Sequence, residues 1–159
     1  MASSQKNLDE HSLHGLKSIE GKKVAVIISD YHHEITSALF TGVESTLIEH
    51  GLSPEDLVKK IVPGAFELTL GAQYMASRSE IDAVICLGCV IMGETKHFDF
   101  ICNSVAAGLT DVGLKFNKPA IFGVLTPNTM QQAKDRAGGK HGNKGVEAAI
   151  AAIKMINFS

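Results

Sequence analysis

Apolar and polar residues follow one another in blocks that predict strands and helices in turn. Residues 83–87 (AVICL) form an unbroken apolar run bounded by polar residues, a pattern typical of a strand buried on both faces of a parallel sheet. Phe98, Ile101, Val105 and Leu109 then recur at helical spacing and predict a helix ending near residue 116. This unit of strand, loop and helix predicts the centre of an α/β fold.

The same pattern extends to both sides of the central unit. Further strands are predicted at residues 23–29, 56–62 and 120–125, and further helices at 34–50, 68–76, 126–136 and 145–156. Thr126 and Pro127 predict the N-cap and the first turn of one of these helices. The alternation predicts a mostly parallel sheet with helices on both faces, a three-layer αβα arrangement. We expect residues 1–13 to form a mobile arm and residues 14–159 a single domain.

Composition narrows the class of protein. The chain has 159 residues, 45% of them hydrophobic, and a net charge of −2, which predicts one ordinary soluble domain. That charge argues against nucleic-acid or membrane-surface partners, and no apolar run approaches the ~20 residues of a membrane helix. Three cysteines, an odd number, favour free thiols in a reducing compartment, which we take as the cytoplasm.

No metal site is expected. Cys86 and Cys89 have a CxxC spacing, but residues three apart on a strand point to opposite faces and cannot readily share an ion. His32 and His33 are adjacent on an extended turn, and no neighbouring spacing completes a ligand set. The cysteines are therefore interpreted as core thiols.

The carboxyl edge of the predicted sheet concentrates the candidate chemistry. Ligands collect outside the carboxyl ends of parallel strands, and a helix N-terminus favours an anion. Gly93, Glu94 and Thr95, between the central strand and its helix, form a candidate phosphate turn, and His97 behind them suits proton transfer. The alternative is that His97 only caps or packs at the start of the helix.

Two other turns add rings and a cation. Tyr31 and Phe66 could stack on a flat heterocycle, with packing at the sheet edge as the alternative. Arg136 lies in a basic segment at residues 134–144 and suits bidentate phosphate recognition, while the glycines there would let the backbone approach a ligand. A solvated basic loop is the alternative for that segment.

Three long motifs carry a resemblance to a known family. Residues 62–68 (VPGAFEL), 87–100 (LGCVIMGETKHFDF) and 136–145 (RAGGKHGNKG) resemble the 6,7-dimethyl-8-ribityllumazine synthases, in order, within a match from about residue 23 to 156. The resemblance implies a flavodoxin-like, four-stranded parallel sheet. It also implies pentamers, 60-subunit icosahedral shells in many relatives, and an association with riboflavin synthase.

The implied reaction is the penultimate step of riboflavin biosynthesis. 5-Amino-6-(D-ribitylamino)uracil condenses with 3,4-dihydroxy-2-butanone 4-phosphate to give the lumazine, phosphate and water, with no metal or other cofactor. By the resemblance, His97 transfers protons and Arg136 holds phosphate. The remaining implied substrate-binding residues are Tyr31, Ala65, Phe66, Glu67, Val90, Ile91, Gly93, Glu94, Thr95, Phe122 and Lys144. Phe122, Arg136 and Lys144 are expected to come from a neighbouring subunit.

Departures from the family pattern leave other functions open. Tyr31 stands where the family usually has Phe, and His32-His33 stand where an Asn-containing turn is usual. Met92 stands where a basic or polar residue is common, and the loss of that residue would weaken capture of the phosphorylated substrate. A flavodoxin-type carrier would share the sheet and the phosphate turn but would not need both His97 and the basic segment at residues 136–144. A response-regulator receiver would need an acceptor aspartate after the central strand, which is absent. An inactive shell protein would keep only the assembly surfaces.

Overall fold

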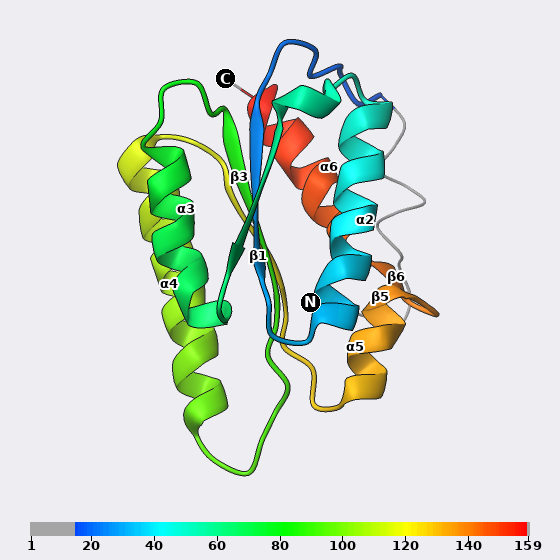
Figure 1. Ribbon diagram of the computed structural model, residues 1–159, viewed down its shortest axis with the longest axis vertical. Coiled ribbons are helices and arrows are strands. Elements are labelled where there is room, and N and C mark those ends of the chain that lie inside the picture. Colours follow the sequence, from blue (N-terminus) through cyan, green and yellow to red (C-terminus); the bar gives the residue numbers. More distant parts are fainter. Residues whose placement is uncertain (1–14, 159) are drawn as a thin grey trace.

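Parallel strands with helices on both faces form the architecture that the sequence predicts. The computed structural model describes residues 15–158, so the arm expected at residues 1–13 lies outside the described residues. Four parallel strands lie in the order β2-β1-β3-β4, and Figure 1 shows β1 and β3 between the helices of the two faces. All residues of β1 (Val24–Ser29) and β3 (Ala83–Cys89) are buried, as expected for the two inner strands. The flavodoxin-like α/β fold is therefore confirmed.

The remaining elements follow the predicted order along the chain. They are α2 (His33–Glu49), β2 (Leu57–Val62), α3 (Leu68–Ala76), α4 (His97–Phe116), β4 (Ala120–Leu125), α5 (Met130–Arg136), β5 (Ala137–Gly139), β6 (Gly142–Asn143) and α6 (Lys144–Ile156), with short 3₁₀ turns at Pro54–Asp56 and Ala65–Glu67. Gly51, with φ of 100°, follows the last turn of α2, as its position in the sequence predicts.

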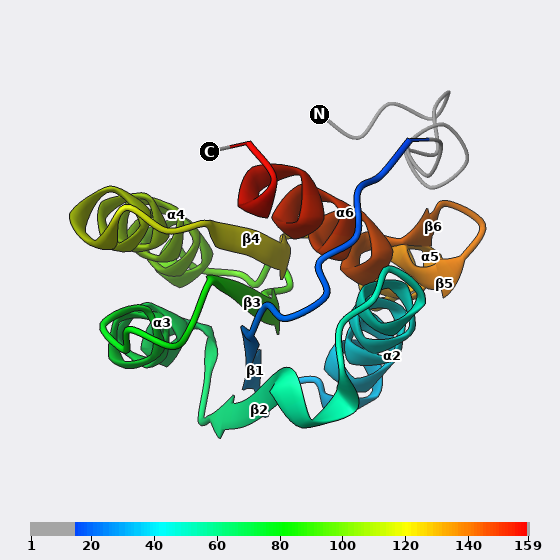
Figure 2. The same ribbon diagram turned by 90° about the horizontal axis from the view of Figure 1, so that it is seen from above.

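Two hydrophobic cores lie on opposite faces of the sheet. Seen from above, α2 and α6 cover one face and α3 and α4 the other (Figure 2). Val26 packs in the first core and Ile27 in the second, which is the two-residue alternation of a strand. Cys89 and Cys86 likewise belong to different cores, so the prediction that they face apart is confirmed.

Two expectations about the stretch after β4 are wrong. Thr126 and Pro127 do not start a helix; Thr129 is the N-cap of α5, and its Oγ1 accepts from the Gln132 N–H at 3.2 Å. The Met92 N–H donates to the Pro127 carbonyl at 2.9 Å, so this segment continues the sheet pairing past β4 instead of turning into a helix. The prediction also lacked the β5–β6 hairpin, which places two strands where only a glycine-rich loop was expected.

Two glycines of the β5–β6 hairpin allow backbone conformations that its turn requires. Gly138 has φ of 104° and Gly142 has φ of 79°, conformations that other residues rarely adopt. The turn itself therefore requires glycine at these two positions, and the expectation that glycines here let the backbone approach a ligand stays a prediction. The hairpin leads directly into α6 and holds residues 136 and 144 near one another at the edge of the cleft described below.

Candidate active site

An aromatic cleft opens at the carboxyl edge of β1 and β3, with a volume of about 580 Å³. We define this aromatic cleft by the residues that line it, which are Tyr31, His32, Gly64, Ala65, Phe66, Glu67, Cys89, Val90, Ile91, His97 and Ile101. They come from the turns after β1, β2 and β3 and from the first turns of α4. The structure thus brings together seven of the residues predicted for the site: Tyr31, Ala65, Phe66, Glu67, Val90, Ile91 and His97.

Two aromatic rings form much of the open surface of this cleft. Tyr31 is 68% exposed and Phe66 is 56% exposed, although each follows a strand of the main sheet. Rings that only packed at the sheet edge would be covered, because burying an aromatic side chain is strongly favourable. The exposure of both rings favours stacking on a ligand over the packing alternative.

His97 is the first residue of α4 and lies at the mouth of the aromatic cleft. Its backbone N–H donates to Thr95 Oγ1 at 3.4 Å, its side chain is exposed, and the N-cap residue Lys96 makes no side-chain capping bond. The imidazole therefore neither caps nor packs, in contrast to the structural alternative. It is free to meet a ligand in the cleft.

The candidate phosphate turn lies just outside the cleft. Gly93, Glu94 and Thr95 are exposed and do not line it, although they lead directly into α4. A Cβ built on Gly93 would meet no atom within 4 Å, so the backbone there borders open space. An uncapped helix start beside an open turn is a favourable place for an anion.

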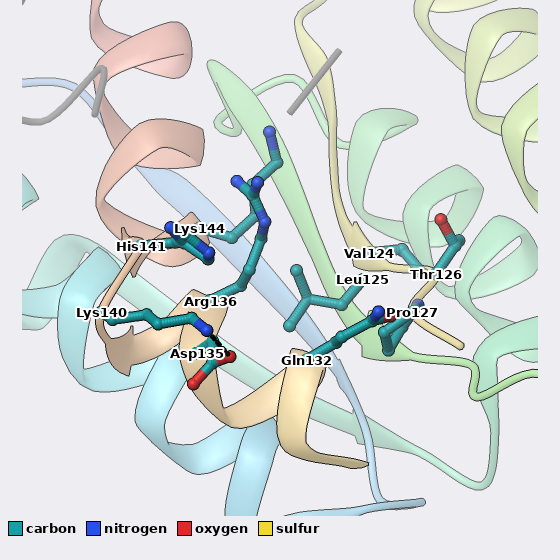
Figure 3. Close-up of a pocket in the computed structure, with 10 residues that line it drawn as sticks. All are labelled: Val124, Leu125, Thr126, Pro127, Gln132, Asp135, Arg136, Lys140, His141 and Lys144. Atoms are coloured by element: carbon teal, nitrogen blue, oxygen red, sulfur yellow. Dashed lines mark ion pairs between the residues drawn. The ribbon is translucent and has the colours of Figure 1, made fainter. Parts of the chain in front are cut away.

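A second, cationic cleft of about 480 Å³ lies between the end of β4 and helices α5 and α6. We define this cationic cleft by Val124, Leu125, Thr126, Pro127, Gln132, Asp135, Arg136, Lys140, His141 and Lys144. Figure 3 shows Arg136, His141 and Lys144 on one wall, facing Val124, Leu125 and Pro127 on the other. The predicted residues Arg136 and Lys144 are therefore close to one another and separate from His97.

Most cations of this segment already have carboxylate partners. The pairs are Lys134–Glu34 at 3.1 Å, Lys140–Asp135 at 3.2 Å and Lys144–Glu147 at 3.0 Å. Within residues 15–158, Arg136 has no such partner. A hydrogen bond from Gln131 and the nearby Lys140 and His141 lower the pKa of Asp135, which therefore stays a carboxylate. Arg136 is the cation that remains available for an anion.

The two clefts border the same extension of the sheet, in which the residues after β3 pair with the end of β4 and the residues after it. The Val90 N–H donates to the Leu125 carbonyl at 2.8 Å, and Met92 pairs with Pro127 in the same way. Val90 lines the aromatic cleft, whereas Leu125 and Pro127 line the cationic cleft, and no residue lines both. Phe122, partly exposed on the edge strand β4, lines neither. One chain therefore does not unite all the predicted site residues.

The cysteines do not add a reactive group to either cleft. Burial raises the pKa of the Cys86 thiol strongly and that of Cys89 to about 11, and burial together with Asp99 raises the pKa of Cys102. All three are free and protonated at neutral pH. Cys86 and Cys89 are core thiols as predicted, whereas Cys102 is only partly buried on α4 and belongs to neither core. Among residues 15–158, no cluster of His, Cys, Asp and Glu could hold a metal ion, and no helix is long and apolar enough to cross a membrane.

Four residues that line the aromatic cleft were not predicted for the site, namely His32, Gly64, Cys89 and Ile101, and only His32 among them carries an aromatic ring. In the sequence, His32 and His33 suggest a metal site that no neighbouring spacing completes, and they replace the Asn-containing turn of the family pattern. The available signal for His32 was its position next to Tyr31 in a turn at the carboxyl edge. Its backbone conformation, with φ of 58° and ψ of 50°, could not be read from the sequence.

Comparison with known proteins gives one consistent result. Residues 21–159 match the family model described as 6,7-dimethyl-8-ribityllumazine synthase. A protein of that name from Cytophaga hutchinsonii is 52% identical over 98% of this chain and 98% of its own length. Similar proteins of the same name are found in Parabacteroides distasonis, with 47% identity over 100% of this chain and 99% of the relative, and in Flavobacterium johnsoniae, with 45% identity over 98% and 82%.

Proposed function

The chain belongs to the 6,7-dimethyl-8-ribityllumazine synthase family, and we propose that its aromatic and cationic clefts together form the active site. It is a transferase of riboflavin biosynthesis that condenses 5-amino-6-(D-ribitylamino)uracil with 3,4-dihydroxy-2-butanone 4-phosphate. The products are 6,7-dimethyl-8-ribityllumazine, phosphate and water. The substrates are thus one flat heterocycle carrying a polyol and one small phosphorylated ketone.

The aromatic cleft receives the pyrimidine in this proposal. The exposed rings of Tyr31 and Phe66 support stacking on both sides of a heterocycle. Ala65, Glu67, Val90 and Ile91, which line the same cleft, would hold the edge of the ring and the ribityl chain. Only Glu67 among these four has a charged side chain, so it is the natural partner for the hydroxyl and N–H donors of the substrate.

The phosphate of the second substrate is held by two parts of the protein. One is the turn of Gly93, Glu94 and Thr95 before the uncapped start of α4. The other is Arg136, whose guanidinium fork matches two phosphate oxygens and has no carboxylate partner within residues 15–158. Lys144 is a weaker candidate, because Glu147 already neutralises much of its charge.

The chemistry needs positioned substrates and a proton carrier. The amine of the pyrimidine attacks the ketone, and an imine forms with loss of one water. Phosphate is then eliminated, and the ribitylamino nitrogen attacks the remaining carbonyl and closes the new ring with loss of a second water. His97, free at the mouth of the aromatic cleft, would take and return protons during these steps. Holding two substrates together contributes the rest of the acceleration by avoiding a bimolecular encounter.

The observation that carries this proposal is the separation of His97 from Arg136. The two residues line clefts with no lining residue in common, which supports a site that takes His97 from one copy of the chain and Arg136 from another. We therefore propose a homo-oligomer, specifically a pentamer, in which Phe122, Arg136 and Lys144 of one subunit complete the aromatic cleft of the next. We also propose that the pentamers close into a 60-subunit shell and associate with riboflavin synthase. The three free thiols support a cytoplasmic location.

A two-product assay tests the proposal. Purified protein receives both substrates, and phosphate release is followed together with the fluorescence of the lumazine. Equal rates of the two signals are expected, with neither signal when one substrate is omitted. Tight binding of the pyrimidine without turnover would instead support a carrier, and no binding and no turnover would support an inactive shell protein.

A further inference from the structure

The backbone of His32 is left-handed in the tight turn between β1 and α2. Only two non-glycine residues of the described chain have positive φ, His32 at 58° and Asn117 at 50°. Asn117 is the C-cap of α4, where a left-handed residue commonly ends a helix. His32 is instead the N-cap of α2, a position that normally has an extended backbone, and its side chain makes no capping bond.

The side chain of His32 is in contact with the neighbouring ring of Tyr31. The imidazole of His32 meets the ring of Tyr31 edge to face, with centroids 4.9 Å apart and planes at 81°. Both residues line the aromatic cleft, and His32 is half-buried while Tyr31 is largely exposed. Among residues 15–158, no other aromatic ring contacts Tyr31.

We propose that His32 is a positioning residue, whose left-handed backbone places its ring so that it holds the Tyr31 ring ready for the pyrimidine substrate. This inference rests on the proposed function of the aromatic cleft. An exposed tyrosine ring that turned freely would lose its rotational freedom when a heterocycle stacked on it, and affinity would fall accordingly. His32 restricts that freedom before the substrate arrives. A costly backbone conformation at a ligand cleft is consistent with such a role.

The chain offers a direct measurement of the Tyr31 ring. It contains two tyrosines and no tryptophan, so in a Tyr74→Phe background the fluorescence of Tyr31 is observed alone. Tyr74 lies on α3 and does not line the aromatic cleft. Time-resolved anisotropy of the full-length assembly then reports how freely the Tyr31 ring moves.

His32→Asn and His33→Asn form a matched pair of variants. Asparagine accepts a left-handed backbone, so His32→Asn removes the ring while it preserves the turn. His33 is exposed, does not line the aromatic cleft and interacts with Ser37 at 3.3 Å. Fast motion of the Tyr31 ring should increase in His32→Asn and stay at the wild-type amplitude in His33→Asn. Equal amplitudes in all three proteins would overturn the inference.

A binding measurement connects ring motion to affinity. Calorimetric titration with 5-amino-6-(D-ribitylamino)uracil alone should give a dissociation constant about threefold to tenfold higher in His32→Asn than in wild type. Turnover with both substrates saturating should change less than twofold. His32→Gly, which also accepts the backbone, should match His32→Asn; if it binds like wild type, the ring is not the cause. A wild-type protein that fails to bind the pyrimidine contradicts the proposed function, whereas the anisotropy result still decides the role of His32.

Discussion

The aromatic and cationic clefts differ in chemistry and lie back to back. The aromatic cleft combines two exposed rings, a carboxylate and His97, which suits a flat polar heterocycle and proton transfer. The cationic cleft combines Arg136, Lys140, His141 and Lys144, which suits a phosphate. Exposed aromatic rings therefore line only the aromatic cleft, and an arginine and lysines line only the cationic cleft.

The difference indicates why one chain is not a complete enzyme in our proposal. The condensation brings a heterocycle and a phosphorylated ketone to within bonding distance, so both sets of groups must meet at one point. The sheet extension that carries Val90 and Leu125 separates the two clefts of a single chain. A cyclic assembly with the same heterologous contact at each interface would bring the cationic cleft of one copy to the aromatic cleft of the next.

The largest expected effect comes from removing the proton carrier of the aromatic cleft. His97→Ala should lower turnover by up to about 10²–10⁴-fold, because a positioned acid or base typically contributes that much. The dissociation constant of the pyrimidine should change little, since stacking and polar contacts remain. Steady-state kinetics and calorimetric titration measure the two quantities separately. Wild-type turnover in His97→Ala would show that this side chain does not move protons here.

The next effect belongs to the cationic cleft. Arg136→Ala should raise the KM of the butanone phosphate by about 10–10²-fold, since a charge-assisted hydrogen bond contributes about 1.5–3 kcal/mol. Affinity for the pyrimidine should stay the same. Lys134→Ala is the matched control, because Lys134 is on the same helix but pairs with Glu34 outside the cleft. A comparable rise in that control would mean that general charge, not a phosphate site, is responsible.

A mixing experiment tests whether the two clefts meet across an interface. His97→Ala and Arg136→Ala chains are dissociated, mixed equally and reassembled. About one quarter of the sites in a closed ring would then receive both wild-type residues. Activity should recover to roughly that fraction of wild type, compared with each mutant carried through the same procedure. If gel filtration confirms mixed oligomers and activity stays at the parental average, both residues act from one chain.

The elements of this fold follow closely from local patterns. Unbroken apolar runs predicted β1 and β3, and helical spacing predicted α2 and α4, because these signals depend on nearby residues alone. The start of α5 was misplaced for the opposite reason. Thr126 and Pro127 have the local signature of a helix start, but a hydrogen bond from Met92, distant in sequence, keeps that segment extended.

Several residues that line the two clefts were predictable from the sequence, whereas their distribution between the clefts was less so. The exposed rings, His97 and Arg136 were all identified from residue type and motif. Which of them share a cleft depends on how β3 and β4 continue past the sheet, a tertiary feature. The contact between His32 and Tyr31 depends on a left-handed backbone that a histidine rarely adopts, so no propensity would predict it.

The smallest expected effect distinguishes the two predicted cations of the cationic cleft. Lys144 Nζ lies 3.0 Å from Glu147 Oε2, and the Glu147 side chain is only 11% exposed, so this pair is partly shielded from water. Glu147→Gln keeps a hydrogen-bond acceptor at that position but removes the negative charge. Lys144 would then present its full charge to the phosphate of the butanone substrate.

We expect Glu147→Gln to lower the KM of the butanone phosphate by about twofold to threefold, within the 0.2–1 kcal/mol that exposed ion pairs contribute. The gain should shrink as ionic strength rises, because salt screens the interaction, and the dissociation constant of the pyrimidine should stay constant. In a Lys144→Ala background the same substitution should have no effect on KM. A gain that persists without Lys144 would assign the change to Glu147 itself, and an increase in KM would show that the ion pair serves the start of α6 instead of the phosphate.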